Sequence, residues 1–145
     1  MVASSVKYGA QWPERANDMA RVLMIEDNAA NMKLAVFLLE QAGHEVFQIS
    51  DAEEGIRLAR ERLPDLILLD IQLPGMDGLT ATRQLRADAL TRGIKVVALT
   101  AFAMAGDQEK IKAAGCDGYI AKPIRYQEFL GVVAEMTAGS ARQHR

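Results

Sequence analysis

The chain has 145 residues, half of them hydrophobic and a quarter charged, and its formal net charge is -2. This length and apolar content fit one domain with one core, and the balanced charge lacks the basic surplus of a nucleic-acid-binding protein. A single cysteine, Cys116, excludes an internal disulfide, and no apolar run approaches the roughly 18 residues of a membrane span. Residues 1–20 lack the apolar core of a signal peptide. We therefore expect a soluble, cytoplasmic protein.

Five short apolar runs along the chain predict five β-strands. They are Val22–Ile25, Val46–Ile49, Leu66–Leu69, Val96–Leu99 and Tyr119–Ala121. Between and after these runs, apolar residues recur at helical spacing. The clearest helical stripes are Met32, Ala35, Val36 and Leu39; Ala52, Ile56, Ala59 and Leu63, before Pro64; and Phe129, Val132, Val133 and Met136. Strands that alternate with helices predict an α/β fold with a parallel sheet covered on both faces.

Signals for helix ends and domain limits accompany this pattern. Asp51 is a predicted N-cap of the second helix, and Gly43 and Gly115 are predicted left-handed terminators of helical segments. The expected organisation is a flexible extension over residues 1–20, one domain over 21–137, and a polar tail over 138–145.

Four of the predicted strands end at polar residues. Glu26 and Asp27 follow the first strand, Asp70 the third, Thr100 the fourth and Lys122 the fifth. Each alone has an ordinary interpretation: Asp70 as a turn or cap residue, Thr100 as a helix cap, and Lys122 as a surface lysine. Because the carboxyl ends of parallel strands share one edge of the sheet, where such folds bind ligands, the set together predicts a polar cleft.

The residue types in this cleft point to phosphate chemistry. Three carboxylates about 4 Å apart repel one another by about 4 kcal/mol per pair at an effective dielectric near 20. A cation relieves that repulsion, and all-oxygen ligands without His or Cys favour Mg²⁺ over Zn²⁺. A metal ion, a lysine and a hydroxyl beside a carboxylate are what phosphoryl transfer to that carboxylate requires.

Four motifs carry a resemblance to a known family. VLMIEDN, LILLDIQLPGMDG, VVALTA and GYIAKP occur in this order, and residues 22–136 resemble a response-regulator receiver domain of two-component systems. The stretches EDNAANMKL and ALTAFAMAGDQEKIKAAGCDGYIAKPI are similar to bacterial single-domain receivers of the DivK type, and to receiver modules of hybrid kinases. The resemblance implies a flavodoxin-like, doubly wound (βα)5 fold with strand order 2-1-3-4-5.

The resemblance also implies roles for the polar residues. Asp70 would accept a phosphoryl group from a histidine kinase or a histidine phosphotransferase. Asp27 and Asp70 would bind Mg²⁺ directly, Glu26 largely through water, and Gln72 through its backbone carbonyl. The family is not one of conventional enzymes, because a receiver catalyses only its own phosphorylation and dephosphorylation.

The same resemblance describes how the signal would be read out. Thr100 and Lys122 would bind the phosphoryl oxygens, and Tyr119 would act as an aromatic rotamer switch. A tyrosine near a strand end is also an ordinary amphipathic core residue, and both descriptions can hold. The expected output of this stand-alone regulator is protein binding by the fourth helix, fifth strand and fifth helix, or a homodimer on phosphorylation, without nucleic-acid binding or membrane insertion. We also expect a cis bond between Lys122 and Pro123.

Two other function classes fit the sequence less well. A Mg²⁺-dependent phosphohydrolase with an aspartyl nucleophile requires a second acid two residues after that aspartate, where this chain has Gln72, and a cap insertion, which this chain lacks. A flavodoxin-like nucleotide-binding protein requires a phosphate loop, and no GxxxxGK[ST] motif is present.

Overall fold

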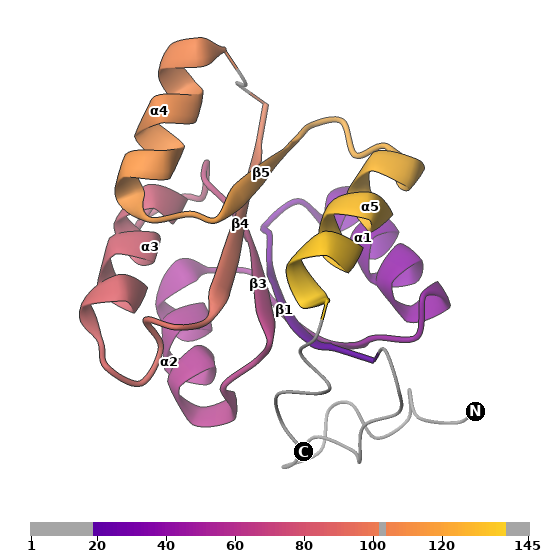
Figure 1. Ribbon diagram of the computed structural model, residues 1–145, viewed down its shortest axis with the longest axis horizontal. Coiled ribbons are helices and arrows are strands. Elements are labelled where there is room, and N and C mark those ends of the chain that lie inside the picture. Colours follow the sequence, from indigo (N-terminus) through magenta and orange to yellow (C-terminus); the bar gives the residue numbers. More distant parts are fainter. Residues whose placement is uncertain (1–18, 102–103, 139–145) are drawn as a thin grey trace.

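The computed structural model describes residues 19–101 and 104–138, which form one parallel sheet between two layers of helices (Figure 1). The strands are β1 (Arg21–Ile25), β2 (Glu45–Ile49), β3 (Leu66–Asp70), β4 (Lys95–Thr100) and β5 (Gly118–Ala121). The helices are α1 (Ala29–Gln41), α2 (Ala52–Arg62), α3 (Gly78–Ala87), α4 (Ala105–Ala114) and α5 (Tyr126–Thr137). The strand order β2-β1-β3-β4-β5 confirms the expected flavodoxin-like topology.

All neighbouring strands pair in parallel, which places their carboxyl ends at one edge. Helices α2, α3 and α4 cover one face of the sheet, and α1 and α5 cover the other (Figure 1). The central strand β3 is buried along its whole length, as the apolar run LILL predicts for a strand covered on both faces. Its last residue, Asp70, is therefore carried into the interior by the hydrophobic residues that precede it.

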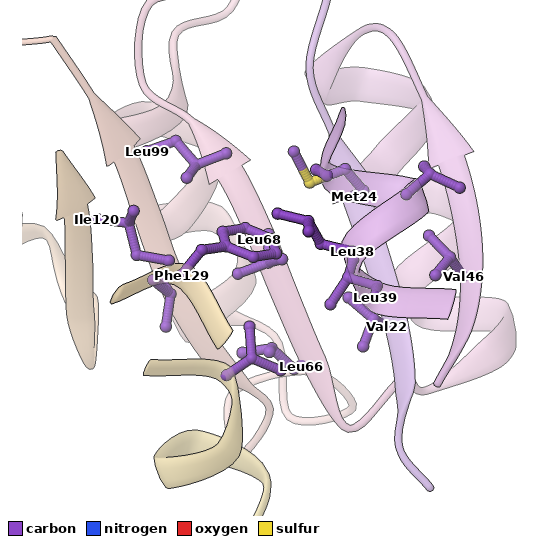
Figure 2. Close-up of a cluster of buried hydrophobic side chains, with 14 of the residues drawn as sticks. Val22, Met24, Leu38, Leu39, Val46, Leu66, Leu68, Leu99, Ile120 and Phe129 are labelled. Carbon is purple, nitrogen blue, oxygen red and sulfur yellow. The ribbon is translucent and has the colours of Figure 1, made fainter. Parts of the chain in front are cut away.

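Two hydrophobic clusters form the core, one on each face of the sheet. Figure 2 shows the first, where Phe129 from α5 and Leu39 from α1 pack against strand residues such as Leu66 and Leu68. The second cluster lies under α2, α3 and α4 and includes Leu85. Burial of these apolar side chains stabilises the sheet on both faces.

The predicted helix-end signals are confirmed. Asp51 accepts a hydrogen bond from Glu54 N at 2.9 Å and caps α2. Gly43 and Gly115 have φ values of 95° and 108°, in the left-handed region that glycine adopts without strain. These glycines end α1 and α4 and let the chain turn into the next strand.

Leu63 departs from its prediction as the last member of a helical stripe. Helix α2 ends at Arg62, and Leu63 follows it with φ 50° and an exposed side chain. The following residue, Pro64, disfavours the right-handed helical conformation for the residue before it. The spacing therefore predicted the helix correctly and its last member wrongly.

The predicted extension and tail lie largely outside the described residues, since the description begins at Met19 and ends at Ala138. Met19 and Ala20 precede β1 and are buried. Ala20 O accepts a hydrogen bond from Glu45 N at 3.0 Å, so the chain is already tied to the sheet there. Among the helices of the described residues, none is long and apolar enough to cross a membrane.

Candidate phosphoryl-acceptor and metal site

The polar residues predicted from the strand ends lie at the carboxyl edge of the sheet. Asp70 and Thr100 are the last residues of β3 and β4, Glu26 and Asp27 follow β1, and Lys122 follows β5. The structure brings the three acids and the lysine into one cluster: one carboxylate oxygen from each acid lies within 4.8 Å of the others, and Lys122 contacts two of the acids.

The turn after β3 holds Asp70 in place. Asp70 Oδ1 accepts a hydrogen bond from Gln72 N at 2.8 Å, and Gly78 N donates to Ile71 O at 3.2 Å. A Cβ at Gly78 would lie 2.6 Å from both Asp70 O and Ile71 Cα, so only glycine lets α3 start this close to the end of β3. Gly75 has φ 77°, as turn chemistry in the Pro-Gly segment predicts.

Lys122 is placed by the end of β4. Its backbone N donates to Thr100 O at 2.7 Å, and the bond to Pro123 is cis, which confirms the expected geometry. Lys122 Nζ lies 2.8 Å from Asp70 Oδ2 and 3.2 Å from Glu26 Oε1. The ammonium group therefore bridges two buried carboxylates.

The three acids differ in their surroundings. Glu26 and Asp70 are each 2% exposed, whereas Asp27 is exposed. Burial raises the pKa of Glu26 to about 7, and the adjacent Asp70 carboxyl adds to the rise. A hydrogen bond from Asn28 N to Glu26 Oε2, at 3.1 Å, and the charge of Lys122 act in the opposite direction. The Glu26 carboxyl is thus poised between its charged and neutral forms near neutral pH.

The pKa of Lys122 is raised above its ordinary value. Burial alone would lower it, but the hydrogen bond and the charge of Asp70, together with Glu26, outweigh burial. The ammonium form therefore persists across the neutral range and supplies a fixed positive charge beside Asp70.

The donor set fits a hard divalent cation. Glu26, Asp27 and Asp70 offer oxygen ligands only, which suit Mg²⁺. Glu26 Oε1 is buried without a hydrogen bond of good geometry, although Lys122 Nζ lies nearby. An under-satisfied buried carboxylate oxygen of this kind is what a metal-bound water or a cation would complete.

The remaining predicted residues surround this cluster. Thr100 is fully buried, and Gln72 is exposed on the β3–α3 turn. Tyr119 lies on the edge strand β5, where it is 36% exposed and is in register with Ala98 of β4. Asn28 follows the two acids and caps α1, because its side chain accepts a hydrogen bond from Asn31 N, as the position of an Asn before a helical stripe indicates. Its backbone N also donates to Glu26 Oε2, a contact that the sequence alone does not indicate.

Comparison with known proteins defines the class to which this fold and cluster belong. Residues 22–134 match the response regulator receiver domain family. The chain therefore belongs to this family, which is not a family of conventional enzymes. Family membership implies interaction with histidine kinases or phosphotransfer proteins, as the sequence predicts.

Within the family, the chain is similar to DivK. It is 47% identical to the polar-differentiation response regulator DivK of Brucella anthropi over 112 residues, which are 77% of this chain and 91% of that protein. DivK of Brucella ovis shows the same identity and coverage. The chain thus has the receiver domain of a DivK-like response regulator.

Solved structures agree with this assignment. A response regulator from Chloroflexus aurantiacus superposes with a TM-score of 0.79 at 29% identity, covering 82% of this chain and 98% of that one. The receiver domain of the sensor histidine kinase PA1611 from Pseudomonas aeruginosa superposes with a TM-score of 0.75 at 34% identity, covering 81% and 96%. That receiver was solved with a magnesium ion coordinated in its active-site cleft.

Proposed function

We propose that Asp70 accepts a phosphoryl group from a phosphohistidine of a kinase or phosphotransfer protein. The observation that carries this proposal is the convergence of Glu26, Asp27 and Lys122 on Asp70 at one edge of the sheet. A carboxylate oxygen of Asp70 attacks the phosphorus, the P–N bond to the donor histidine breaks, and its electron pair stays on the imidazole nitrogen. The product is an aspartyl phosphate.

The reaction depends on Mg²⁺ in this proposal. When bound, Mg²⁺ supplies positive charge next to the transferring phosphoryl group. Asp27 and Asp70 would bind it directly, Glu26 would bind it through water, and the backbone carbonyl of Gln72 would complete the protein ligands. The all-oxygen cluster and the magnesium-bound structure of the PA1611 receiver support this part of the proposal.

Lys122 and Thr100 bind the oxygens of the phosphoryl group. Lys122 Nζ already lies 2.8 Å from Asp70 Oδ2, so it meets the new charge with a small rearrangement. Thr100 ends the strand next to Asp70, and its hydroxyl is the neutral donor of that strand end. The additional charge of a phosphoryl group and its acceptor oxygens attract both groups.

The output is phosphorylation-dependent protein binding by the face formed by α4, β5 and α5. Tyr119, Tyr126 and Met104 all leave large apolar or aromatic surface exposed on these elements. Inward rotation of Tyr119 after Thr100 moves would change that surface. Since the change is a shift between two states, phosphorylation acts by favouring one of them by a few kcal/mol. A second copy of the chain is the alternative occupant of this face. A cytoplasmic location is part of this proposal, and the single free cysteine supports it.

Labelling with acetyl phosphate tests this function. The parent protein with Mg²⁺ should gain one phosphoryl group per molecule, and Asp70→Asn should gain none. Glu53→Gln, which removes an exposed carboxylate on α2, is the matched control and should label like the parent. Labelling of Asp70→Asn, or continuous turnover of phosphoesters by the parent, would contradict the proposal.

A further inference from the structure

Arg86, near the end of α3, contacts both the turn before β4, which follows it closely in the sequence, and the distant junction between α4 and β5. Its Nε donates to Gly115 O at 2.8 Å, and its Nη1 donates to Arg92 O at 2.8 Å and Ile94 O at 2.7 Å. Its Nη2 forms an ion pair with Asp117 Oδ2 at 2.8 Å. The guanidinium group therefore joins α3 to the turn before β4 and to the C-terminal end of α4. Such a fork with several fixed acceptors is specific to arginine.

The junction between α4 and β5 is fixed by the same group of residues. Asp117 Oδ2 also accepts from Val96 N at 2.8 Å, and Asp117 N donates to Val96 O at 2.7 Å. Gly115, whose carbonyl oxygen accepts from Arg86 Nε, also packs closely against the Arg86 side chain. A Cβ at Gly115 would lie 2.8 Å from Arg86 Cγ. A cation at a helix C-terminus is also favoured by the helix dipole.

Among the described residues, the other end of α4 is the more exposed one. Met104, at its N-cap position, makes no side-chain cap hydrogen bond and is 76% exposed. Ala105 and Gly106 begin the helix and are also exposed. The buried residues of α4, Ile111 and Ala114, both lie in its second half. A glycine in the first turn lowers helix propensity further.

We propose that Arg86 anchors the C-terminal end of α4, so that this end of the helix opens far less often than the end that begins at Ala105. The contacts of its guanidinium group hold the α4–β5 junction against α3, whereas the first turn of α4 buries no side chain. The inference concerns the unphosphorylated protein and does not depend on the function proposed above.

Amide hydrogen exchange of the metal-free protein, followed residue by residue by NMR, tests the anchor. The readout is the ratio of the protection factor of Cys116, whose N donates to Ile111 O, to that of Glu109. We expect this ratio to be at least about ten in the parent and to fall to about one in Arg86→Met. A general loss of stability would lower both protection factors without this selective loss.

Arg83→Met is the matched control, because Arg83 is an exposed arginine on the same helix and should leave the ratio unchanged. If Arg86→Met does not fold, Arg86→Lys replaces it, because lysine keeps the positive charge but lacks the branched guanidinium group. This variant should lower the ratio at least about threefold. Equal protection at both ends of α4 in the parent would overturn the proposal. An unchanged ratio in the folded Arg86 variant would overturn it as well.

Discussion

Lys122 Nζ lies 2.8 Å from Asp70 Oδ2, although the two residues are 52 positions apart in the sequence. The same ammonium lies 3.2 Å from Glu26 Oε1, so it offsets the repulsion between two buried carboxylates. Sequence reasoning about strand ends found all three residues because they follow apolar runs. The close pairing itself depends on the tertiary arrangement of β1, β3 and β5.

Replacing Lys122 by Met should destabilise the metal-free protein. Removing one partner of a buried ion pair costs roughly 3–5 kcal/mol, and we expect about 2 kcal/mol here because the Lys122 side chain is 16% exposed. Mg²⁺ should restore part of this loss by replacing the missing positive charge. Urea unfolding with and without Mg²⁺ measures both effects, and Lys95→Met, at an exposed position of β4, is the control. Equal stability of Lys122→Met and Lys95→Met without metal would contradict this account.

Glu26 should make the metal-free protein less stable as the pH rises toward neutrality. The pKa of its carboxyl is about 7 in the folded protein, against an ordinary value of 4.5. Between these values the folded protein keeps a proton that the unfolded chain has lost, so the free energy of unfolding falls as the pH rises through this window. The fall is about 3 kcal/mol at most.

Glu26→Gln removes this titration, so the fall in the free energy of unfolding between pH 4.5 and about 7 should be smaller in this variant than in the parent. Chemical unfolding at several pH values within that range, without Mg²⁺, measures the difference between variant and parent. Glu53→Gln serves as the control, since this exposed carboxyl should leave the profile of the parent unchanged. The same slope in Glu26→Gln and parent would show that another group is responsible.

His44 should act in the opposite direction. Burial lowers the pKa of its imidazole, with Asp65 opposing this effect, and neutral Nδ1 accepts a hydrogen bond from Ala20 N at 3.0 Å. Below pH 6.5 the imidazole binds a proton more readily in the unfolded chain than in the folded protein. The free energy of unfolding therefore decreases as the pH falls. His44→Asn offers an oxygen acceptor that does not titrate and should reduce acid sensitivity. Thermal unfolding at pH 5 and pH 7.5 provides the comparison, and an unchanged difference between the two pH values would exclude this role.

Gly78 and Gly131 should respond to alanine with opposite signs. A Cβ at Gly78 would meet backbone atoms of Asp70 and Ile71 at 2.6 Å, so α3 must move away from β3. We expect Gly78→Ala to cost about 2–3 kcal/mol, within the range of overpacking. Gly131 lies inside α5 with nothing within 4 Å of its Cβ position, so Gly131→Ala should stabilise by about 0.5–1 kcal/mol. Urea unfolding of both variants measures the pair, and a loss at Gly131 or no loss at Gly78 would contradict the local geometry.

The sequence predicted most clearly the elements whose burial is continuous, and it indicated less clearly those held by isolated contacts. The five strands and the stripes of α1, α2 and α5 have enough apolar residues to define a period. Helix α4 buries only Ile111 and Ala114, so its spacing carries little signal. The contacts of Arg86 are mainly with backbone carbonyls, which have no sequence signature. Leu63 was misplaced because the conformational effect of Pro64 outweighs helical periodicity at that position.

Tyr119 should move when the acceptor site is occupied. Its ring is now partly exposed on β5, while Thr100 is fully buried at the end of the adjacent β4. In the proposed function, a phosphoryl group on Asp70 draws Thr100 toward it and vacates space that the Tyr119 ring fills. Beryllofluoride with Mg²⁺ mimics that group without covalent turnover. The expected result is a changed environment for Tyr119 and little change for Tyr126, which begins α5 and is 60% exposed.

Fluorine NMR of protein labelled with 3-fluorotyrosine measures both rings in one spectrum, with assignments from Tyr119→Phe and Tyr126→Phe. Bound beryllofluoride gives its own fluorine signals, so occupancy of the site is read in the same experiment. Thr100→Ala should keep these bound signals and lose the shift of Tyr119, because the space behind residue 100 is then open in both states. If the Tyr119 resonance does not shift while beryllofluoride is bound, the effect of phosphorylation leaves the domain without movement of this ring.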